Sequence, residues 1–377
     1  MTAKLSVAVI GAGIGGLATA AALRRAGIHV TVYEQARRFA RLGAGIQVGC
    51  NAMHVLRGLG LEQRMRRDAF YPRSWNNRDW RTGEVRYDQI FGRGAEEKYG
   101  APYLLAHRGD LHAALASAVP GEHIRLDHKV VRLDEKAGSV VLGFADGSAA
   151  AHDGVVAADG VHSLVKGLLF SDEQARFTGR IAYRTTFPAS LLSGGTIDDC
   201  TKWWGEDRHI VIYYVRPNRS EVYFVTSQPE PGFTVESWSA KGDMPTLRAA
   251  FDGFHSQVQQ VLAACPDVHK WALVDRDPLR QWHDGNVTLL GDACHPMTPY
   301  MAQGAAMALE DAAVLSRLMA EVDDRAGIAG AFRRLEATRK ARTSRVQLTS
   351  RTNTWLRGKT DVDWVYSYNP WTAPLAA

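Results

Sequence analysis

The N-terminal segment, residues 5 to 35, constrains the fold of this chain most strongly. It reads LSVAVIGAGIGGLATAAALRRAGIHVTVYEQ, an apolar run, a glycine turn, a helical stretch, a second apolar run and an acid. Gly11, Gly13 and Gly16 form GxGxxG, which permits a tight turn, close approach of a pyrophosphate and close helix–strand packing. Glu34 stands where a carboxylate can accept hydrogen bonds from ribose hydroxyls. The segment therefore predicts a dinucleotide-binding unit of the Rossmann type.

A second glycine-rich loop indicates which dinucleotide this is. RLGAGIQVGCN, residues 41–51, follows Glu34 closely and leads into a helical stretch. An NAD-dependent dehydrogenase would normally continue with further strand–helix–strand units. Two glycine loops so close together favour a flavin nucleotide lying across the unit. An NAD-dependent dehydrogenase stays as the alternative of a different class, because it also explains the first motif and Glu34.

Two further acids are expected at strand ends. Asp159 in GVVAADGVHSLVK and Asp292 in GDACHPMTPYMAQGAAMALEDA each follow an apolar run, stand beside a glycine and precede a helical stretch. A carboxylate at the end of a buried strand is costly unless it has a partner. The helix expected from Gly304 offers unpaired N–H groups to an anionic or electron-rich group. In AHRGDLHAAL, Arg108 precedes a helix that we expect Asp110 to cap.

Composition excludes several classes of function. The 377 residues suggest about two domains, and a net charge of +5 that is scattered along the chain indicates no nucleic-acid partner. The four cysteines are far apart and form no CxxC pair, so we expect reduced thiols and no metal site. No apolar run reaches the roughly 18 residues of a membrane span. A cytoplasmic protein that does not associate with membranes is expected.

The ordered motifs resemble those of a known family. GAGIGG with Glu34, AADGVHS and GDACHPMTPYMAQGAAMALEDA are similar to the motifs of FAD-dependent aromatic hydroxylases of the p-hydroxybenzoate and salicylate hydroxylase type. Within that family, RLGAGIQVGCN, KWWGEDRHIVIYY and HPMTPYMAQGA resemble segments of 6-hydroxynicotinate 3-monooxygenases. The resemblance implies an α/β fold, in which a Rossmann-like FAD-binding domain is interleaved with a mostly antiparallel β-sheet substrate domain.

The resemblance also gives a division of the chain. We expect residues 1–75, 101–170 and 276–350 to form the FAD-binding domain, and residues 76–100 and 171–275 to form the substrate domain. Residues 351–377 are an aromatic C-terminal tail that packs either on the body of the chain or on a second subunit. A monomer and a homodimer are both compatible with this.

The resemblance implies a set of FAD-binding residues for a non-covalently bound cofactor. The set comprises Gly11, Gly13, Gly16, Glu34, Gln47, Arg108, Asp159, Asp292, Gly304 and Ala305. In this interpretation Asp292 binds the ribityl or pyrophosphate part. The helix that starts at Gly304 and Ala305 faces the pyrimidine end of the flavin, where its dipole stabilises negative charge. Lys166 stands where the family often has arginine.

The segment KWWGEDRHIVIYYVR predicts a substrate wall. Period-two alternation places Trp203, His209, Val211 and Tyr213 on one face of a strand, and Trp204 on the other. SEVYFVTSQP, residues 220–229, is predicted to be the neighbouring strand. Sheet packing is the alternative role for the aromatic face. The resemblance makes His209, Tyr213, Gln47 and Tyr300 the catalytic candidates, and related enzymes commonly carry histidine at the last two positions.

The chemistry follows from the same resemblance. NADH or NADPH, with NADH preferred, reduces FAD, and O2 then forms a flavin C4a-hydroperoxide that hydroxylates a small aromatic substrate. The predicted substrate is a hydroxylated pyridinecarboxylate similar to 6-hydroxynicotinate, with or without loss of the carboxylate. Because Gln47 and Tyr300 depart from the pattern, 6-hydroxypicolinate and salicylate- or hydroxybenzoate-type substrates remain alternatives. A flavin-binding module without turnover is a further alternative.

Overall fold

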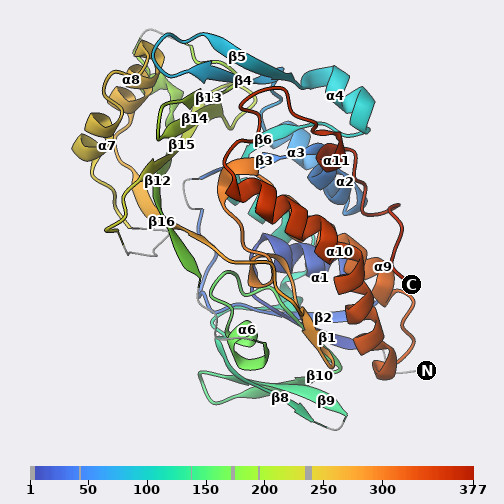
Figure 1. Ribbon diagram of the computed structural model, residues 1–377. Coiled ribbons are helices and arrows are strands. Elements are labelled where there is room, and N and C mark those ends of the chain that lie inside the picture. The colour runs from blue at the N-terminus through green and yellow to red at the C-terminus, as the bar shows by residue number, and fades with distance from the viewer. Residues whose placement is uncertain (1–4, 42–43, 137, 171–174, 194–195, 234–239) are drawn as a thin grey trace.

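The computed structural model describes residues 5–41, 44–136, 138–170, 175–193, 196–233 and 240–377. Leu42 and Gly43 of the second glycine-rich loop, and the first residues of the segment 171–275, lie outside this part. Figure 1 shows two lobes, with the first strands and α1 in the lower lobe and a broad sheet in the upper lobe. The long helices α9 and α10 run along one side.

The first sheet contains six described strands in the order β17-β18-β11-β1-β2-β7. Their bounds are β1 Ser6–Ile10, β2 His29–Tyr33, β7 Ile124–Arg125, β11 Gly154–Ala157, β17 His283–Asp284 and β18 Val287–Leu289. Strand β1 pairs in parallel with β2 and β11, and β11 pairs in parallel with β18. The carboxyl ends of β1, β11 and β18 therefore meet at one edge, which gathers Gly11, Asp159 and Asp292. This is the edge at which open α/β sheets bind ligands.

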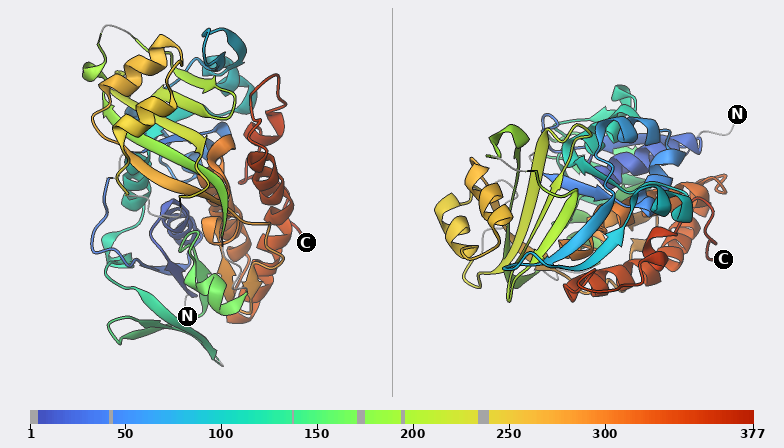
Figure 2. Two further views of the ribbon diagram at one scale, coloured as in Figure 1. Left: turned by 60° about the vertical axis from the view of Figure 1, so that its left-hand side comes forward. Right: turned by 90° about the horizontal axis from the view of Figure 1, so that it is seen from above.

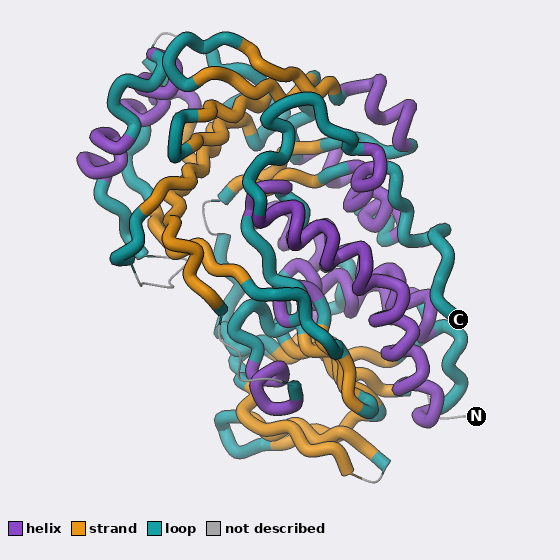
Figure 3. The backbone as a smooth tube through the Cα atoms, viewed as in Figure 1, coloured by secondary structure: helices purple, strands orange, loops and turns teal. Residues whose placement is uncertain are grey.

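Helices cover this sheet because each has an apolar side that needs burial. Their bounds are α1 Ile14–Arg25, α2 Cys50–Gly58, α3 Glu62–Asp68, α4 Gly92–Tyr99, α5 Arg108–Ser117, α6 Leu164–Leu169, α9 Gly304–Met319, α10 Ile328–Arg351 and α11 Asp363–Tyr366. Of these, α1, α9 and α10 run beside the lower strands, whereas α2, α3, α4 and α11 lie higher, towards the upper lobe (Figures 1 and 3). Helices α1 and α9 approach closely, since a Cβ atom on Gly15 would lie 3.2 Å from the Cβ of Ala308.

The second large sheet has seven described strands in the order β16-β12-β15-β14-β13-β4-β5. Their bounds are β4 Ser74–Asp79, β5 Val85–Ile90, β12 Arg176–Pro188, β13 Cys200–Trp204, β14 His209–Tyr214, β15 Glu221–Pro229 and β16 His269–Asp275. All neighbours are antiparallel except β13 and β4. Two separate stretches of chain thus build one sheet, and α7 (Met244–Ala250) and α8 (Ser256–Ala264) cover its outer side (Figures 1 and 2).

Smaller elements complete the described part of the chain. A three-stranded meander lies at the base of the lower lobe, and a two-stranded ribbon joins the lobes. Their strands are β8 Val130–Lys136, β9 Ser139–Phe144, β10 Ala149–His152, β3 Gly45–Val48 and β6 Leu104–His107. Short 3-10 helices are η1 Gly121–His123, η2 Ala189–Leu191, η3 Gly291–Ala293, η4 Pro299–Met301 and η5 Arg325–Gly327.

The C-terminal tail packs on the body of its own chain. The indole N–H of Trp371 donates to the carbonyl of His54 in α2 at 3.0 Å. Tyr366 lies edge-on to Tyr103, with ring centroids 5.6 Å apart. The guanidinium of Arg342 donates to the carbonyl of Trp364 at 2.6 Å. These contacts are those expected of the first packing alternative, packing on the body of the chain.

Candidate active site

The glycine turn between β1 and α1 leaves room for a ligand. Gly11 has φ of +94°, and a Cβ atom there would lie 2.5 Å from the carbonyl oxygen of Ala158, so only glycine fits. A Cβ on Gly16 would lie 1.9 Å from the carbonyl oxygen of Gly11. A Cβ on Gly13, in contrast, would meet nothing within 4 Å. No side chain caps α1, so its first N–H groups face this open space.

Glu34 is fixed beside the glycine turn. One carboxylate oxygen accepts from the backbone N–H of Ala12 at 2.8 Å, and the other accepts from that of Ala36 at 2.8 Å. Each carboxylate oxygen has a second lone pair. The carboxylate is therefore held in place and retains acceptor capacity for ribose hydroxyls.

The surroundings of Asp292 and Arg108 indicate a cleft. The side chain of Asp292 is accessible to solvent, yet the surrounding protein desolvates it and raises its pKa, an effect that His295 and Arg108 partly offset. Burial likewise lowers the pKa of Arg108, and Asp292 opposes this. Solvent accessibility together with strong desolvation is expected of side chains inside a cleft. The two opposite charges are close enough for each to shift the pKa of the other.

Helix α9 begins beside Asp292. It starts at Gly304, as predicted, and no side chain caps it. A Cβ on Gly304 would lie 3.9 Å from a carboxylate oxygen of Asp292. Ala302, just before the helix, has φ of +54°, a left-handed conformation that is uncommon for alanine. The uncapped N–H groups near Gly304 and Ala305 therefore lie next to the cleft.

The cap predicted for α5 is wrong. Asp110 lies inside the first turn, and its carboxylate pairs with Arg216 at 2.8 Å. The capping side chain is that of His107, whose Nδ1 accepts from the backbone N–H of Gly109 at 3.0 Å. The helix begins earlier than the sequence suggested, at Arg108 itself.

Asp159 keeps one oxygen without a partner. The other oxygen accepts from the backbone N–H of Leu164 at 2.9 Å, and Ser163 caps α6 through the N–H of Lys166 at 3.0 Å. Within the described residues, Oδ1 of Asp159 is buried and has no hydrogen-bond partner. Burial raises the pKa of this carboxyl group. The open space at Gly13, the cleft at Asp292 and this oxygen all fit a bound FAD.

The strand face predicted for the substrate wall needs one correction. Trp204 is paired directly with His209 across the β13–β14 hairpin, and Trp203 is paired with Ile210. Directly paired residues share a face. Trp204, and not Trp203, therefore lies with His209, Val211 and Tyr213. The prediction counted the period-two alternation of side chains through residues 205–208. These residues form the turn of the hairpin, where a period of two does not hold.

This face contains the catalytic candidates. The rings of His209 and Tyr300 are 5.5 Å apart in an edge-on arrangement, and the Tyr300 hydroxyl lies 2.9 Å from that of Ser227. The rings of Tyr213 and Tyr223 are 4.9 Å apart. β15 is the neighbour of β14, as predicted. His209, Tyr213 and Tyr300 are thus brought to one wall.

Gln47 lies on the ribbon that faces this wall. Its side-chain oxygen accepts a hydrogen bond from the hydroxyl of Tyr103. A Cβ on Gly45, in the same strand, would lie 2.7 Å from the hydroxyl oxygen of Tyr213. Strand β3 therefore approaches the wall at Tyr213, and Gln47 is held by a hydrogen bond rather than free to swing.

Burial sets the protonation of the wall. It lowers the pKa of His209, with Lys202 and Arg180 adding to the effect, so the imidazole is neutral. It raises the pKa of Tyr213, so that hydroxyl is protonated and can donate. Both side chains are almost completely buried, with exposed fractions of 5% and 2%. At these two positions the wall therefore carries neutral hydrogen-bonding groups that are shielded from solvent.

Sequence analysis missed two basic residues of this region. Lys202 is 1% exposed, and its ammonium nitrogen lies 3.8 Å from the ring centroid of Trp204. Arg184 lies over the ring of Trp271 at 4.3 Å, and burial lowers its pKa. The alternation within KWW is the signal that could have placed Lys202 with Trp204. A lysine in a strand is usually assigned to the solvent face.

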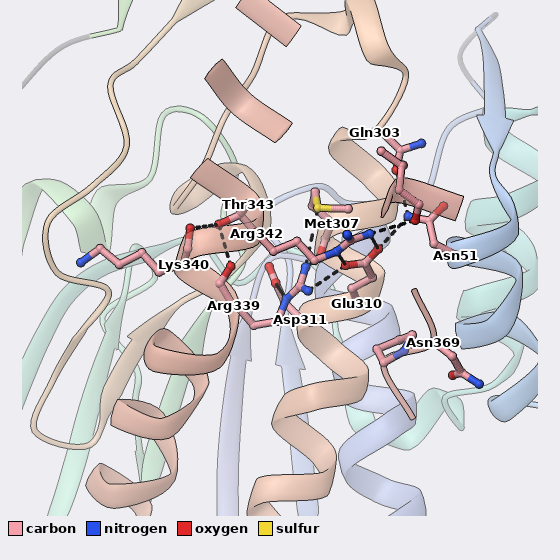
Figure 4. Close-up of polar contacts among 12 residues, drawn as sticks. Asn51, Gln303, Met307, Glu310, Asp311, Arg339, Lys340, Arg342, Thr343 and Asn369 are labelled. Carbon is pink, nitrogen blue, oxygen red and sulfur yellow. Dashed lines mark hydrogen bonds and ion pairs between the residues drawn. The ribbon is translucent and has the colours of Figure 1, made fainter. Parts of the chain in front are cut away.

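A buried ionic network holds α9 against α10 (Figure 4). Glu310 pairs with Arg339 at 2.7 Å and with Arg342 at 2.8 Å, and Asp311 pairs with Arg339 at 2.7 Å. Burial alone would raise the pKa of both carboxyl groups, but the neighbouring cations outweigh it and lower both. Asn51 of α2 donates to Glu310 at 2.7 Å. The network thus fixes the helix whose N-terminus borders the cleft.

Comparisons with known proteins agree with this geometry. The model of a family described as FAD binding domain matches residues 4–350. The chain therefore belongs to this family. A 6-hydroxynicotinate 3-monooxygenase of Bordetella bronchiseptica is 45% identical, covering 100% of this chain and 98% of its own length.

Solved structures give the same result. Klebsiella pneumoniae HpxO complexed with FAD and uric acid matches with a TM-score of 0.84 and 30% identity, covering 97% of this chain and 91% of that one. A salicylate hydroxylase substrate complex matches with a TM-score of 0.83 and 25% identity, covering 98% and 97%.

These findings confirm several predictions from the sequence. The fold class, FAD as cofactor and the enzyme class, an FAD-dependent aromatic monooxygenase, are all confirmed.

Within the described ranges, no helix combines the length and apolarity needed to cross a membrane. The same residues contain no cluster of three or more His, Cys, Asp or Glu side chains arranged to hold a metal ion.

Proposed function

We propose that this enzyme hydroxylates a hydroxylated pyridinecarboxylate similar to 6-hydroxynicotinate, with NADH as the preferred reductant. The observation that carries the proposal is the full-length similarity, at 45% identity, to a 6-hydroxynicotinate 3-monooxygenase. The wall of His209 and Tyr213 supports it, because two neutral hydrogen-bonding groups on one strand face suit the substituents of a single flat ring. Whether the carboxylate is lost is a separate question for product analysis.

The proposed FAD site is the edge of the first sheet. Gly11, Gly13 and Gly16 admit the pyrophosphate, Glu34 binds the adenosine ribose, and Arg108, Asp159 and Asp292 line the rest of the cleft. Bound there non-covalently, FAD would supply the activation of O2. We keep residues 1–75, 101–170 and 276–350 as its domain, and residues 76–100 and 171–275 as the substrate domain.

The residues of the chain position the substrate and exclude water. We propose that Tyr213 donates from its hydroxyl to an anionic oxygen of the ring, and that neutral His209 accepts or donates at a neighbouring substituent. Gln47 and Tyr300 border the same space from β3 and from the segment before α9. Holding the ring in one orientation makes the chemical step effectively unimolecular. This lowers the activation free energy by several kcal/mol in favourable cases.

The alternative substrates are 6-hydroxypicolinate and salicylate- or hydroxybenzoate-type acids. These acids stay as alternatives because Gln47 and Tyr300 stand where related enzymes commonly have histidine. The deciding experiment is NADH oxidation by the purified enzyme with each acid, together with identification of the product. Oxidation stimulated by none of these acids would contradict the proposed function.

Truncation of the wall is expected to uncouple the reaction. His209→Ala and Tyr213→Phe should each raise the substrate Michaelis constant, because each removes one hydrogen bond to the ring. We expect about fivefold for a neutral hydrogen bond worth about 1 kcal/mol, and tenfold or more where the partner is the anionic oxygen. A loosely held ring is hydroxylated less often, so hydrogen peroxide formed per NADH should rise. Tyr214→Phe, on the opposite face of the same strand, is the matched control. Unchanged coupling in both variants would assign His209 and Tyr213 to packing.

A further inference from the structure

Lys202 lies in the middle of the proposed substrate wall. It is paired across the β13–β14 hairpin with Val211, which stands between His209 and Tyr213 on the same face. Its side chain therefore emerges on the face that carries the catalytic candidates. Only 1% of the residue is exposed, so the ammonium group is inside the protein rather than at its surface.

The surroundings of Lys202 contain cations and rings. Its nitrogen lies 3.8 Å from the ring centroid of Trp204 and 5.9 Å from that of Tyr300. Within the described parts of the chain, Lys202 forms no ion pair with a carboxylate. Burial lowers its pKa, and Arg357 and Arg180 lower it further. Aromatic contacts offset part of the cost of a buried ammonium group, but they do not replace a counterion.

A second donor on the same face also has no acceptor. Asn77 of β4 is paired with Lys202, and 0% of the residue is exposed. Its side-chain oxygen accepts from the indole N–H of Trp204 at 2.8 Å, which fixes the orientation of the amide. Among the described residues, its Nδ2 is buried without a hydrogen-bond partner. Within the part of the chain that the structure describes, two neighbouring donors thus lack an acceptor.

We propose that Lys202, assisted by the Asn77 amide, binds an anionic oxygen of the aromatic substrate and so makes the enzyme select ionised substrates. This rests on the proposed function for the reaction, but it identifies a residue and a binding chemistry of its own. A carboxylate and an ionised ring hydroxyl share the required chemistry. Either would supply the missing counterion and accept from both donors.

The test measures substrate binding to the FAD-loaded enzyme without NADH. Binding is monitored through the change in flavin absorbance. The probes are 6-hydroxynicotinate, 2-hydroxypyridine, which lacks the carboxylate, and nicotinate, which lacks the ring hydroxyl. Lys202→Met keeps an unbranched side chain that is one heavy atom shorter, and it removes the charge. It should weaken binding of 6-hydroxynicotinate by tenfold to hundredfold, as expected for loss of a hydrogen bond to a charged group.

The other two probes identify the anionic group. The one that lacks the group contacted by Lys202 should bind equally to the wild type and the variant. Lys270→Met is the control, because Lys270 lies on the opposite face of the same sheet and pairs with Glu230 at 2.6 Å. Equal affinity of wild type and Lys202→Met for all three probes would overturn the proposal.

Thermal stability separates a binding role from a packing role. Removing an unpaired buried charge should leave the melting temperature of the substrate-free Lys202→Met enzyme unchanged or raise it. A packing lysine would lower it, and a lower melting temperature with unchanged binding would refute the proposal. Failure of every acid to stimulate NADH oxidation would instead contradict the proposed function, since these binding measurements require no turnover.

Discussion

Arg339→Met is expected to lower the free energy of unfolding by about 3–5 kcal/mol, the cost of removing one partner of a buried ion pair. Arg339 is completely buried and lies between Glu310 and Asp311, at 2.7 Å from each carboxylate. Methionine fills similar space but leaves Asp311 with His295 at 2.6 Å and Glu310 with Arg342. Chemical denaturation of the purified variant measures the loss.

The pH dependence of the free energy of unfolding distinguishes a charge effect of Arg339→Met from a packing effect. In the wild type the pKa values of Glu310 and Asp311 are lowered by folding. Their contribution to stability is therefore present at a pH above their pKa values in the unfolded chain, and it is lost as the pH falls through their pKa values in the folded protein. In the variant each carboxyl group keeps one partner but loses Arg339, so its pKa should be higher than in the wild type. Lowering the pH then protonates and relieves them, so the deficit should shrink between pH 7 and about pH 4.

A matched control lies on the same helix. Arg334 pairs with Glu321 at 2.6 Å on the surface, with side-chain exposed fractions of 31% and 55%. Arg334→Met should cost no more than about 1 kcal/mol, because surface ion pairs contribute little. A loss of that size in Arg339→Met as well, or a deficit that does not change with pH, would contradict a charge role for the network.

Much of the fold could be predicted because its signals are local. The glycine spacing after β1 and the acids at the ends of β11 and β18 are short patterns, and parallel strands bring their carboxyl ends to one edge. Gly11, Asp159 and Asp292 therefore meet, although 281 positions separate the first from the last. The start of α9 at Gly304 followed from the prolines before it and the apolar stretch after it.

The parts that were wrong or missed depend on the exact residues of turns and helix starts, or on contacts between distant segments. The face of Trp204 is set by the hairpin turn, which changes the count that alternation relies on. The cap of α5 depends on where the helix begins within AHRGD, and composition does not fix that residue. Glu310 and Asp311 are ordinary helix residues in the sequence, and only their contacts with Arg339 and Arg342 show that they are buried pairs.

Lys202 illustrates the same limit for function. The alternation within KWW places Lys202 on the same strand face as Trp204, but it does not show that this face is buried. Its significance appears only when the sheet order places β4 on one side of it and β14 on the other. The edge proposed to bind FAD can thus be predicted from motifs, whereas the proposed substrate wall forms only when strands pair.

Asp292→Ala is expected to weaken FAD binding tenfold to hundredfold, corresponding to about 1.5–3 kcal/mol for a hydrogen bond that a charged group accepts. The carboxylate faces the cleft beside Gly304 and Arg108, where we expect the ribityl hydroxyls of FAD. Flavin content after dialysis and titration of the apoprotein with FAD measure the change.

Asp292→Asn keeps the shape and one acceptor oxygen, so its affinity should be intermediate. The exposed Asp284→Ala should match the wild type, which controls for net charge. Full occupancy and wild-type affinity in Asp292→Ala would mean that the residue only shapes the loop, and the cleft would then bind FAD through its backbone N–H groups and Arg108.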